Sequence, residues 1–452
     1  MPNSSYGSEF DAPGATPDGD LETQLMDTFD FTNGSLCCDS HSLSDIADQF
    51  GTPVYVYSAR AFREHYAALR DAFAAIEPRL CFSIKSCHNV HILRTLLECG
   101  SSFDAVSIGE VRRALEAGAK ASDIVFAGVG KTPAEIEAAV DLGVGTFNAE
   151  SAAELDVIAA VANKARKNVR AALRINPDVD AKTHPHTTTG KDENKFGIEI
   201  GSSPALFQKH KDDPYLSLVG IHLHIGSPVN TVAPYVEMVT KALELVVKLK
   251  ADGVNIDSIN IGGGYGAEYG HQSSATPREY ADAIVPLLKD SGLKVSLEPG
   301  RSISANAGIL ITRVVYLKES RTKQFVIVDG SMTDLIRPAL YDAYHFIWPV
   351  SPAGGVAPSD RSPAYRIEGA RPVDIVGPVC ESSDYLGRNR FIPAVKQGDL
   401  LAVFSAGAYG AVMGSQYNTR CRAAEVLVES DGPRLIRRRE TFDDIMACER
   451  NL

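Results

Sequence analysis

The sequence has little of several features that mark whole classes of protein. Its 452 residues include eight cysteines, which form neither a CxxC pair of the metal-binding type nor a dense disulfide framework. No apolar stretch approaches the about 20 residues that a membrane span needs. The 45 lysines and arginines form no basic cluster and are outnumbered by 57 acidic residues. These absences argue against a zinc-binding module, a membrane protein and a nucleic-acid-binding protein, and favour a small-molecule partner.

The amino-terminal residues 1–27 are rich in Gly, Pro, Ser, Asp and Glu and poor in large apolar groups. We expect them to be a disordered leader, because they bury too little apolar surface to offset the entropy of ordering. The segment has neither the basic stretch nor the apolar stretch of a secretory signal. We therefore expect a cytoplasmic protein with reduced thiols.

From residue 52 onward, short apolar runs alternate with amphipathic segments, which is typical of a (β/α)₈ barrel. We predict this barrel over residues 52–310. The predicted strands are 54–58, 80–85, 103–107, 124–128, 145–148, 169–175, 218–225, 258–262 and 294–297, and helices are predicted at 133–141, 152–165 and 232–251.

After residue 310 the sequence changes to β-branched runs separated by turns. This predicts a mainly β domain over residues 311–452, which the segment 28–51 is expected to join. Its predicted strands are 311–316, 324–328, 371–376, 399–404 and 425–428, with a short helix at 441–448.

Lys85 lies at the end of the apolar run Arg79–Lys85. A lysine there would point into the cavity that the strand ends line, where desolvation can lower its pKa and make it a nucleophile of the Schiff-base type. The alternative is a solvated lysine at the edge of a strand. The residues at the other strand ends bear on this choice, because in a barrel they all converge on one mouth.

Three other segments follow predicted strands. The glycines 262–264 could let backbone N–H groups approach a phosphate, or could simply form a turn. Glu298 and Arg301 place a carboxylate and an anion-binding guanidinium at the same mouth, unless they form a surface ion pair. His222 and His224 share one face of a strand, where two histidines also suit a metal site. We find no third histidine at a later strand end, since His271 and His345 lie in other contexts, and predict no metal.

Together these motifs resemble the group IV pyridoxal-phosphate decarboxylases, which have an alanine-racemase-like barrel, and in particular the members that act on diaminopimelate. The resemblance covers residues 28–430. The motifs that carry it are Phe82–Lys85, Asp104–Glu110, Lys195–Ile198, His222–Ser227, Gly262–Gly264, Glu298–Arg301, Asp334–Tyr341, Gly377–Asp384 and Gly407–Gly410.

The resemblance implies that Lys85 binds pyridoxal phosphate covalently and that His224 stacks on its ring. Glu298 would face the ring nitrogen, where a carboxylate stabilises the protonated ring as an electron sink. Alanine racemases place an arginine there, so the carboxylate favours decarboxylation. The residues implied to hold the phosphate or line the cofactor are Ser227, Gly262, Gly263, Gly264, Gly300, Arg301 and Tyr409.

At the far end of the substrate, the resemblance assigns Arg301, Arg337 and Tyr341 to the distal carboxylate, and Tyr409 to the substrate as well as the cofactor. Glu381 would meet the distal ammonium group. Cys380 would cross a dimer interface and reprotonate the carbanion, which requires a homodimer with shared sites. A structural interpretation of Cys380, as a small buried hydrophobe, is the alternative.

The implied reaction is the decarboxylation of meso-2,6-diaminopimelate to L-lysine and CO₂ in lysine biosynthesis. The chain departs from the family pattern at residues 86–88, at Ile108 and at Pro228. A related decarboxylase acting on another or a carrier-bound amino acid therefore remains an alternative. A non-catalytic pyridoxal-phosphate carrier would lack the β domain and Cys380, and a metal-dependent barrel hydrolase would be inhibited by a chelator.

Overall fold

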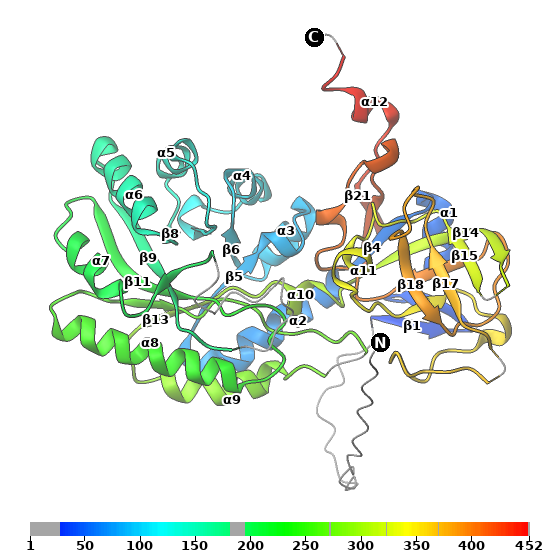
Figure 1. The fold of residues 1–452 in the computed structure, drawn as a ribbon, viewed down its shortest axis with the longest axis horizontal. Helices are drawn as coiled ribbons and strands as arrows, with labels where there is room; N and C mark the ends of the chain where they lie inside the picture. Colours follow the sequence, from blue (N-terminus) through cyan, green and yellow to red (C-terminus); the bar gives the residue numbers. More distant parts are fainter. Residues whose placement is uncertain (1–27, 181–194, 271–272, 322, 369, 451–452) are drawn as a thin grey trace, which may run out of the picture.

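The computed structural model describes residues 28–180, 195–270, 273–321, 323–368 and 370–450. It has two domains side by side, a barrel of strands and helices on the left of Figure 1 and a mainly β domain on the right. Among the residues described, no helix is both long and apolar enough to cross a membrane. The predicted leader, residues 1–27, lies outside this part of the chain.

The first domain is a closed barrel of eight parallel strands, which confirms the predicted (β/α)₈ fold. The strands are β5 (Arg79–Ser83), β6 (Ser102–Ala105), β7 (Ile124–Phe126), β8 (Thr146–Ala149), β9 (Val169–Asn176), β11 (Leu216–Leu223), β12 (Ser258–Asn260) and β13 (Lys294–Leu297). Each pairs with its neighbour in chain order, and β13 pairs with β5 to close the ring. A two-residue strand, β10 (Ile198–Glu199), lies beside β9.

Helices cover the outside of this barrel (Figure 1). They are α2 (Ala59–Ala72), α3 (Val90–Glu98), α4 (Ile108–Ala117), α5 (Pro133–Leu142), α6 (Ala152–Ala165), α7 (Ser203–His210), α8 (Ala233–Ala251) and α9 (Pro277–Leu288), and the short α10 (Arg301–Ser304) follows β13. Local sequence fixes several helix starts. The Thr132 side chain accepts a hydrogen bond from the Glu135 backbone in a capping box, with Pro133 as the first helical residue of α5.

The predicted strand Val54–Ser58 forms as β4, but its assignment to the barrel is wrong. β4 lies in the second domain, between β14 (Gly308–Glu319) and β20 (Ala424–Glu429). All five residues of β4 are buried, and a strand that is buried on both faces does not reveal from its sequence which sheet it joins. The barrel therefore starts with α2 at Ala59, and the chain returns to the sheet of the second domain at Gly308, where β14 begins.

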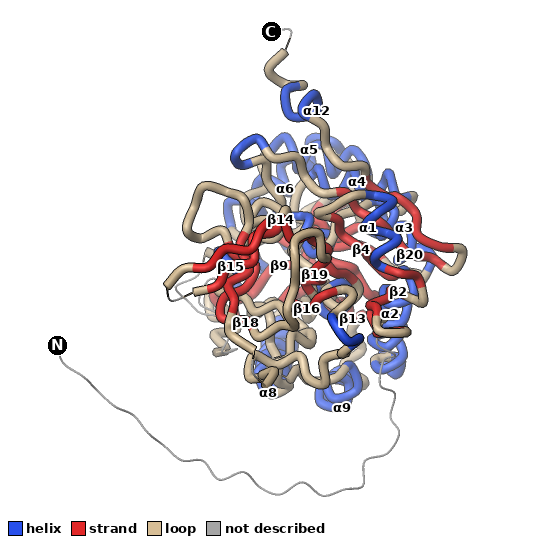
Figure 2. Tube along the Cα trace, turned by 90° about the vertical axis from the view of Figure 1, so that its right-hand side faces the viewer, coloured by secondary structure: helices blue, strands red, loops and turns tan. Residues whose placement is uncertain are grey.

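The second domain is mainly β, as predicted, and Figure 2 looks onto it with the barrel behind. Its main path runs β18-β17-β15-β14-β4-β20-β21, and β19 pairs with β14 and β16. The strands not yet given are β15 (Gln324–Val328), β16 (Ile347–Pro349), β17 (Val373–Val376), β18 (Tyr385–Arg390), β19 (Leu400–Val403) and β21 (Gly432–Arg437), and the helices are α11 (Arg337–Tyr341) and α12 (Phe442–Met446). Strands β16, β18 and β21 were not predicted.

The amino-terminal segment forms a small antiparallel sheet of its own, followed by α1 (Leu43–Phe50). Its strands are β1 (Phe29–Thr32), β2 (Ser35–Cys38) and β3 (His41–Ser42). The Leu36 N–H donates to the Val350 carbonyl at 2.7 Å, which places the segment against the second domain. One continuous apolar core extends from Phe29 through the barrel to Ile436 and joins the two domains.

Candidate active site

Lys85 lies next to a buried carboxylate at the mouth of the barrel. Strand β5 ends at Ser83, and Lys85 lies on the single turn Ile84–Ser86 that follows, not in the strand itself. Its Nζ is 3.0 Å from Asp104 Oδ2, at the end of the neighbouring strand β6. Ser83 Oγ donates to the same oxygen at 2.8 Å.

The sequence predicted a lowered pKa for the Lys85 amine, and the structure shows that this prediction is wrong. Burial does lower this pKa, but the charges of Asp104, Tyr409 and Glu298 outweigh burial and raise it above its ordinary value. Asp104 belongs to one of the motifs quoted above but was not predicted as a site residue. The amine is therefore held as an ammonium ion until a proton is removed from it.

Glu298 is held as a carboxylate by three neighbours. It is 4% exposed. Its Oε1 accepts hydrogen bonds from Asn260 Nδ2 at 2.7 Å and Asn148 Nδ2 at 3.1 Å. Its Oε2 is 3.0 Å from His222 Nε2, which must donate because an ionised carboxylate only accepts. Burial raises the pKa of Glu298, but His222 and Lys85 outweigh burial and hold the pKa at about 2.

The two histidines of the His222–His224 segment have different surroundings. His222 contacts Glu298. His224 lies beside the glycine loop, and burial, then the positive charges of Arg174 and Lys85, hold its pKa well below the ordinary value. In the described part of the chain, no three His, Cys, Asp or Glu side chains are placed to share a metal ion. A neutral imidazole is suited to packing on an aromatic ring.

The glycine loop 262–264 passes very close to the ends of two strands. Gly262 and Gly264 have φ values of +69° and +98°, which favour glycine. A Cβ on Gly263 would lie 2.0 Å from the Glu298 carbonyl oxygen, and one on Gly264 would lie 2.2 Å from that of Gly226. The loop therefore needs glycine for its own packing, whether or not it also binds a phosphate.

Arg301 connects the barrel mouth to the second domain. Its Nε donates to Ser227 Oγ at 3.1 Å, and its Nη1 donates to the Tyr269 hydroxyl at 3.0 Å. The guanidinium lies 4.9 Å from the centre of the Tyr409 ring. The Tyr409 N–H donates to the Ser86 carbonyl at 2.8 Å, beside Lys85. Gly300, just before Arg301, packs against Ser83. A Cβ added to Gly300 would lie 3.0 Å from the Cβ of Ser83.

Arg337 and Tyr341 begin and end the short helix α11, so their spacing of four is helical. Arg337 is 8% exposed, and its Nη1 is 2.7 Å from His345 Nε2. Its guanidinium also lies 4.9 Å from the centre of the Tyr269 ring. The charges of Tyr341 and Arg301 act on Arg337 as well. His345 and Tyr269 thus belong to the site, although the sequence did not predict them.

Cys380 and Glu381 contact residues outside this cluster. Cys380 is exposed, and its N–H donates to Asn418 Oδ1 at 3.1 Å. Glu381 Oε1 accepts from Ser383 Oγ at 2.5 Å. In the described part of this single chain, neither side chain hydrogen-bonds or pairs with the residues around Lys85.

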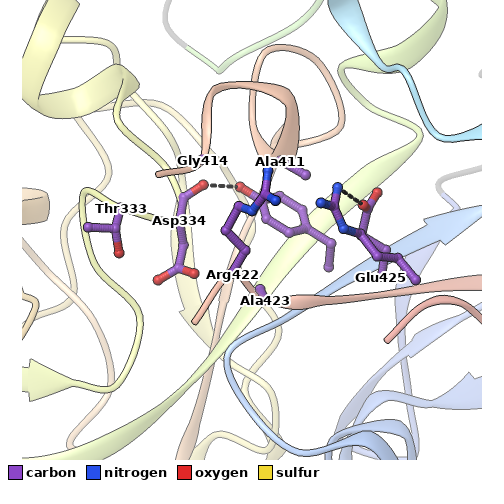
Figure 3. A pocket seen from close by; sticks show the side chains of 9 residues that line it. Thr333, Asp334, Ala411, Gly414, Arg422, Ala423 and Glu425 are labelled. Atoms are coloured by element: carbon purple, nitrogen blue, oxygen red, sulfur yellow. Dashed lines mark hydrogen bonds and ion pairs between the residues drawn. The ribbon is translucent and has the colours of Figure 1, made fainter. Parts of the chain in front are cut away.

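A separate small pocket lies in the second domain (Figure 3). It is lined by Tyr55, Thr333, Asp334, Ala411, Gly414, Arg422, Ala423, Glu425 and Arg437. Tyr55 donates to the Asp334 carbonyl at 2.7 Å, and Arg437 pairs with Glu425 at 3.3 Å. Burial raises the pKa of the Asp334 carboxyl to about 6. Two of its lining residues, Thr333 and Asp334, shortly precede Arg337 in the sequence, and none of the predicted site residues lines the pocket.

The donor set at the barrel mouth fits pyridoxal phosphate. Lys85 supplies a primary amine for the aldehyde, and the buried, ionised Glu298 suits a protonated ring nitrogen. Arg301, Ser227 and the glycine loop together offer a guanidinium, a hydroxyl and closely placed backbone to a phosphate.

Comparisons with known proteins bear directly on this site. The family model described as "Pyridoxal-dependent decarboxylase, pyridoxal binding domain" matches residues 59–305. The chain is 45% identical over 415 residues to a diaminopimelate decarboxylase of Neisseria meningitidis, covering 92% of this chain and 99% of the relative. A diaminopimelate decarboxylase of Pseudomonas aeruginosa is 43% identical over 424 residues, with 94% and 99% covered.

The fold of this chain is also similar to that of a solved structure. The crystal structure of diaminopimelate decarboxylase from M. jannaschii in co-complex with L-lysine superposes with a TM-score of 0.86 at 35% sequence identity. The superposition covers 94% of this chain and 98% of that one.

Proposed function

The chain belongs to the diaminopimelate decarboxylases, a family of pyridoxal-dependent decarboxylases, and from this membership we infer that it converts meso-2,6-diaminopimelate to L-lysine and CO₂. It is a carboxy-lyase of lysine biosynthesis with pyridoxal phosphate as cofactor. The observation that carries the chemistry is the buried Glu298, which stays ionised within electrostatic range of the Lys85 amine.

Pyridoxal phosphate, when bound, supplies the electron sink for the bond that breaks as CO₂ leaves. We propose that Glu298 holds a proton at the ring nitrogen. With a pKa of about 2, Glu298 itself does not take that proton at neutral pH. Lys85 is the proposed covalent attachment point, and Asp104, 3.0 Å away, is placed to hold a proton at its amine.

The proposal assigns the remaining mouth residues to cofactor binding. His224, with a neutral imidazole, would pack on the ring face, and Tyr409 would line the cofactor and the substrate. The residues assigned to the phosphate are Ser227, Gly262, Gly263, Gly264, Gly300 and Arg301.

Arg301, Arg337 and Tyr341 are proposed to bind the distal carboxylate of the substrate. Arg301 and Arg337 are at most 8% exposed, and within the described residues their guanidiniums contact Ser227, Tyr269 and His345 but pair with no carboxylate. A buried cation without an anion is unfavourable, so a ligand carboxylate would stabilise both.

We also propose a cytoplasmic homodimer in which Cys380 and Glu381 complete the partner's site, Cys380 as proton donor and Glu381 as ligand of the distal ammonium group. Two observations support this. Both residues are exposed, neither contacts the described groups around Lys85 in its own chain, and all eight cysteines are free thiols.

The test is CO₂ release by the purified protein from meso-diaminopimelate, compared at equal concentration with ornithine, lysine and arginine. The proposal expects product from meso-diaminopimelate and little from the other three, since none of them carries a distal carboxylate. Release only from ornithine, lysine or arginine would show that the departures at residues 86–88, Ile108 and Pro228 mark a different specificity.

A further inference from the structure

Two buried arginines, Arg301 and Arg337, share one tyrosine. Tyr269 is 7% exposed and lies on the loop after the glycines. Its hydroxyl accepts from Arg301 Nη1 at 3.0 Å, while its ring lies 4.9 Å below the Arg337 guanidinium. One side chain therefore touches both cations, through its oxygen and through its ring face.

The phenol responds to both charges. Burial raises the pKa of Tyr269, but Arg337 and then Arg301 outweigh burial and lower the pKa below its ordinary value. Like-charged guanidiniums repel each other, and burial together with Arg301 lowers the pKa of Arg337. The electron-rich oxygen and ring of Tyr269 offset part of this repulsion.

His345 forms a hydrogen bond with Arg337. It is fully buried, and its Nδ1 lies 2.9 Å from the Phe404 carbonyl oxygen. Because arginine only donates, His345 Nε2 must accept from Arg337 Nη1, and Nδ1 must carry the proton that it donates to Phe404. Burial and the charge of Arg337 keep the pKa of His345 well below its ordinary value, so the ring stays neutral.

The two aromatic residues also contact each other. The Tyr269 and His345 rings meet edge to face, with centroids 5.7 Å apart and planes at 88°. A loop of the barrel and a buried histidine of the second domain thereby set the separation and direction of the two guanidiniums.

We propose that Tyr269 and His345 are positioning residues that hold Arg301 and Arg337 ready for the distal carboxylate, and that they thereby determine the preference for substrates with a carboxylate at the far end. This inference rests on the proposed function, because it takes the distal carboxylate as the anion that the two arginines bind.

The test compares two ligands that differ only in that carboxylate. L-Lysine keeps the distal carboxylate of diaminopimelate, and cadaverine is lysine without it. Inhibition constants for both are measured on the holoenzyme for wild type, Tyr269→Phe, His345→Leu and His345→Gln, with Tyr66→Phe as a control. Tyr66 is a buried tyrosine on α2. Like Tyr269→Phe, Tyr66→Phe removes a buried hydroxyl and keeps the ring.

The preference for lysine over cadaverine is expected to fall by at least about tenfold in Tyr269→Phe and His345→Leu, the loss typical of a hydrogen bond to a charged group. Cadaverine binding should not change. KM for diaminopimelate should rise while kcat changes little. His345→Gln should recover part of the preference, because its amide oxygen can accept from Arg337, and Tyr66→Phe should match wild type.

An unchanged lysine preference in folded Tyr269→Phe and His345→Leu overturns this inference while leaving the proposed function intact. A wild-type protein that binds lysine no better than cadaverine and does not decarboxylate diaminopimelate overturns the proposed function, and the inference with it. Equal weakening of lysine and cadaverine would show a general structural role and also contradict the inference.

Discussion

The Lys85 amine lies 3.0 Å from the Asp104 carboxylate, at the ends of two neighbouring strands. This ion pair raises the pKa of the amine against the opposing effect of burial. In the proposed function this amine captures the aldehyde of the cofactor, which needs the neutral amine, so we expect Asp104 to control the pH at which the cofactor attaches.

We therefore predict that Asp104→Asn moves the pH midpoint for covalent attachment of pyridoxal phosphate to the apoprotein to lower pH, by at least about one unit. The measurement is borohydride-trapped cofactor as a function of pH. Asp156→Asn, which removes an exposed partner of Lys209 on the outer helix α6, should leave the midpoint unchanged. An unshifted midpoint in Asp104→Asn would contradict the role of the pair.

Glu298 should be essential for the chemical step and dispensable for folding. Glu298→Gln keeps a similar shape but has no negative charge to hold a proton at the ring nitrogen. We expect kcat for diaminopimelate to fall by about 100-fold or more, with bound cofactor still present by absorbance. Because His222 and Lys85 hold the pKa of Glu298 well below its ordinary value, we expect any acid limb of the wild-type pH profile above pH 4 to come from another group.

The buried carboxyl of Asp334 should make stability depend on pH. Its folded pKa of about 6 lies above the ordinary 3.8, so the folded state binds more protons between these values. Stability therefore falls as pH rises through this window and stays lower above it. The difference corresponds to about 2 to 3 kcal/mol.

Asp334→Asn should remove this penalty, because an amide oxygen can still accept from the Ser331 N–H. We expect the variant to be more stable than wild type at pH 8 and similar at pH 4 by urea unfolding. Asp443→Asn, at an exposed ion pair, should change stability by less than about 0.5 kcal/mol at both pH values. Equal stability of Asp334→Asn and wild type at pH 8 would refute the assignment.

Shared active sites should be visible in mixed dimers. Lys85→Ala and Cys380→Ala should each be inactive alone. If Cys380 acts in the partner's site, a hybrid dimer contains one site with both residues intact, and random mixing should restore about a quarter of wild-type activity. Mixing that restores nothing, with hybrid dimers verified by mass spectrometry, would place Cys380 outside the partner's site.

Much of the fold was predictable because its signals are local. Helix α6 follows from its own amphipathic pattern, and its predicted bounds, Ala152–Ala165, are the observed ones. The strand Val54–Ser58 was recognised but placed in the wrong sheet, since its buried residues fit either one.

The candidate site was predictable only where a sequence motif itself contains the residues that come together. Glu298 and Arg301 follow one strand and lie where the motif indicates. The charge environment of Lys85 was predicted wrongly, because Asp104 reaches it from the next strand. Tyr269 and His345 were missed. Their contacts with Arg301 and Arg337 form only when the chain folds, and no sequence motif contains both partners of either contact.

The account depends most on Lys85 carrying the cofactor. Borohydride reduction of the holoenzyme followed by peptide mapping tests this directly. We expect one phosphopyridoxyl label on the peptide that contains Lys85, and no label in the same peptide of Lys85→Ala. A label on another lysine, or none in the wild-type protein, would contradict the account.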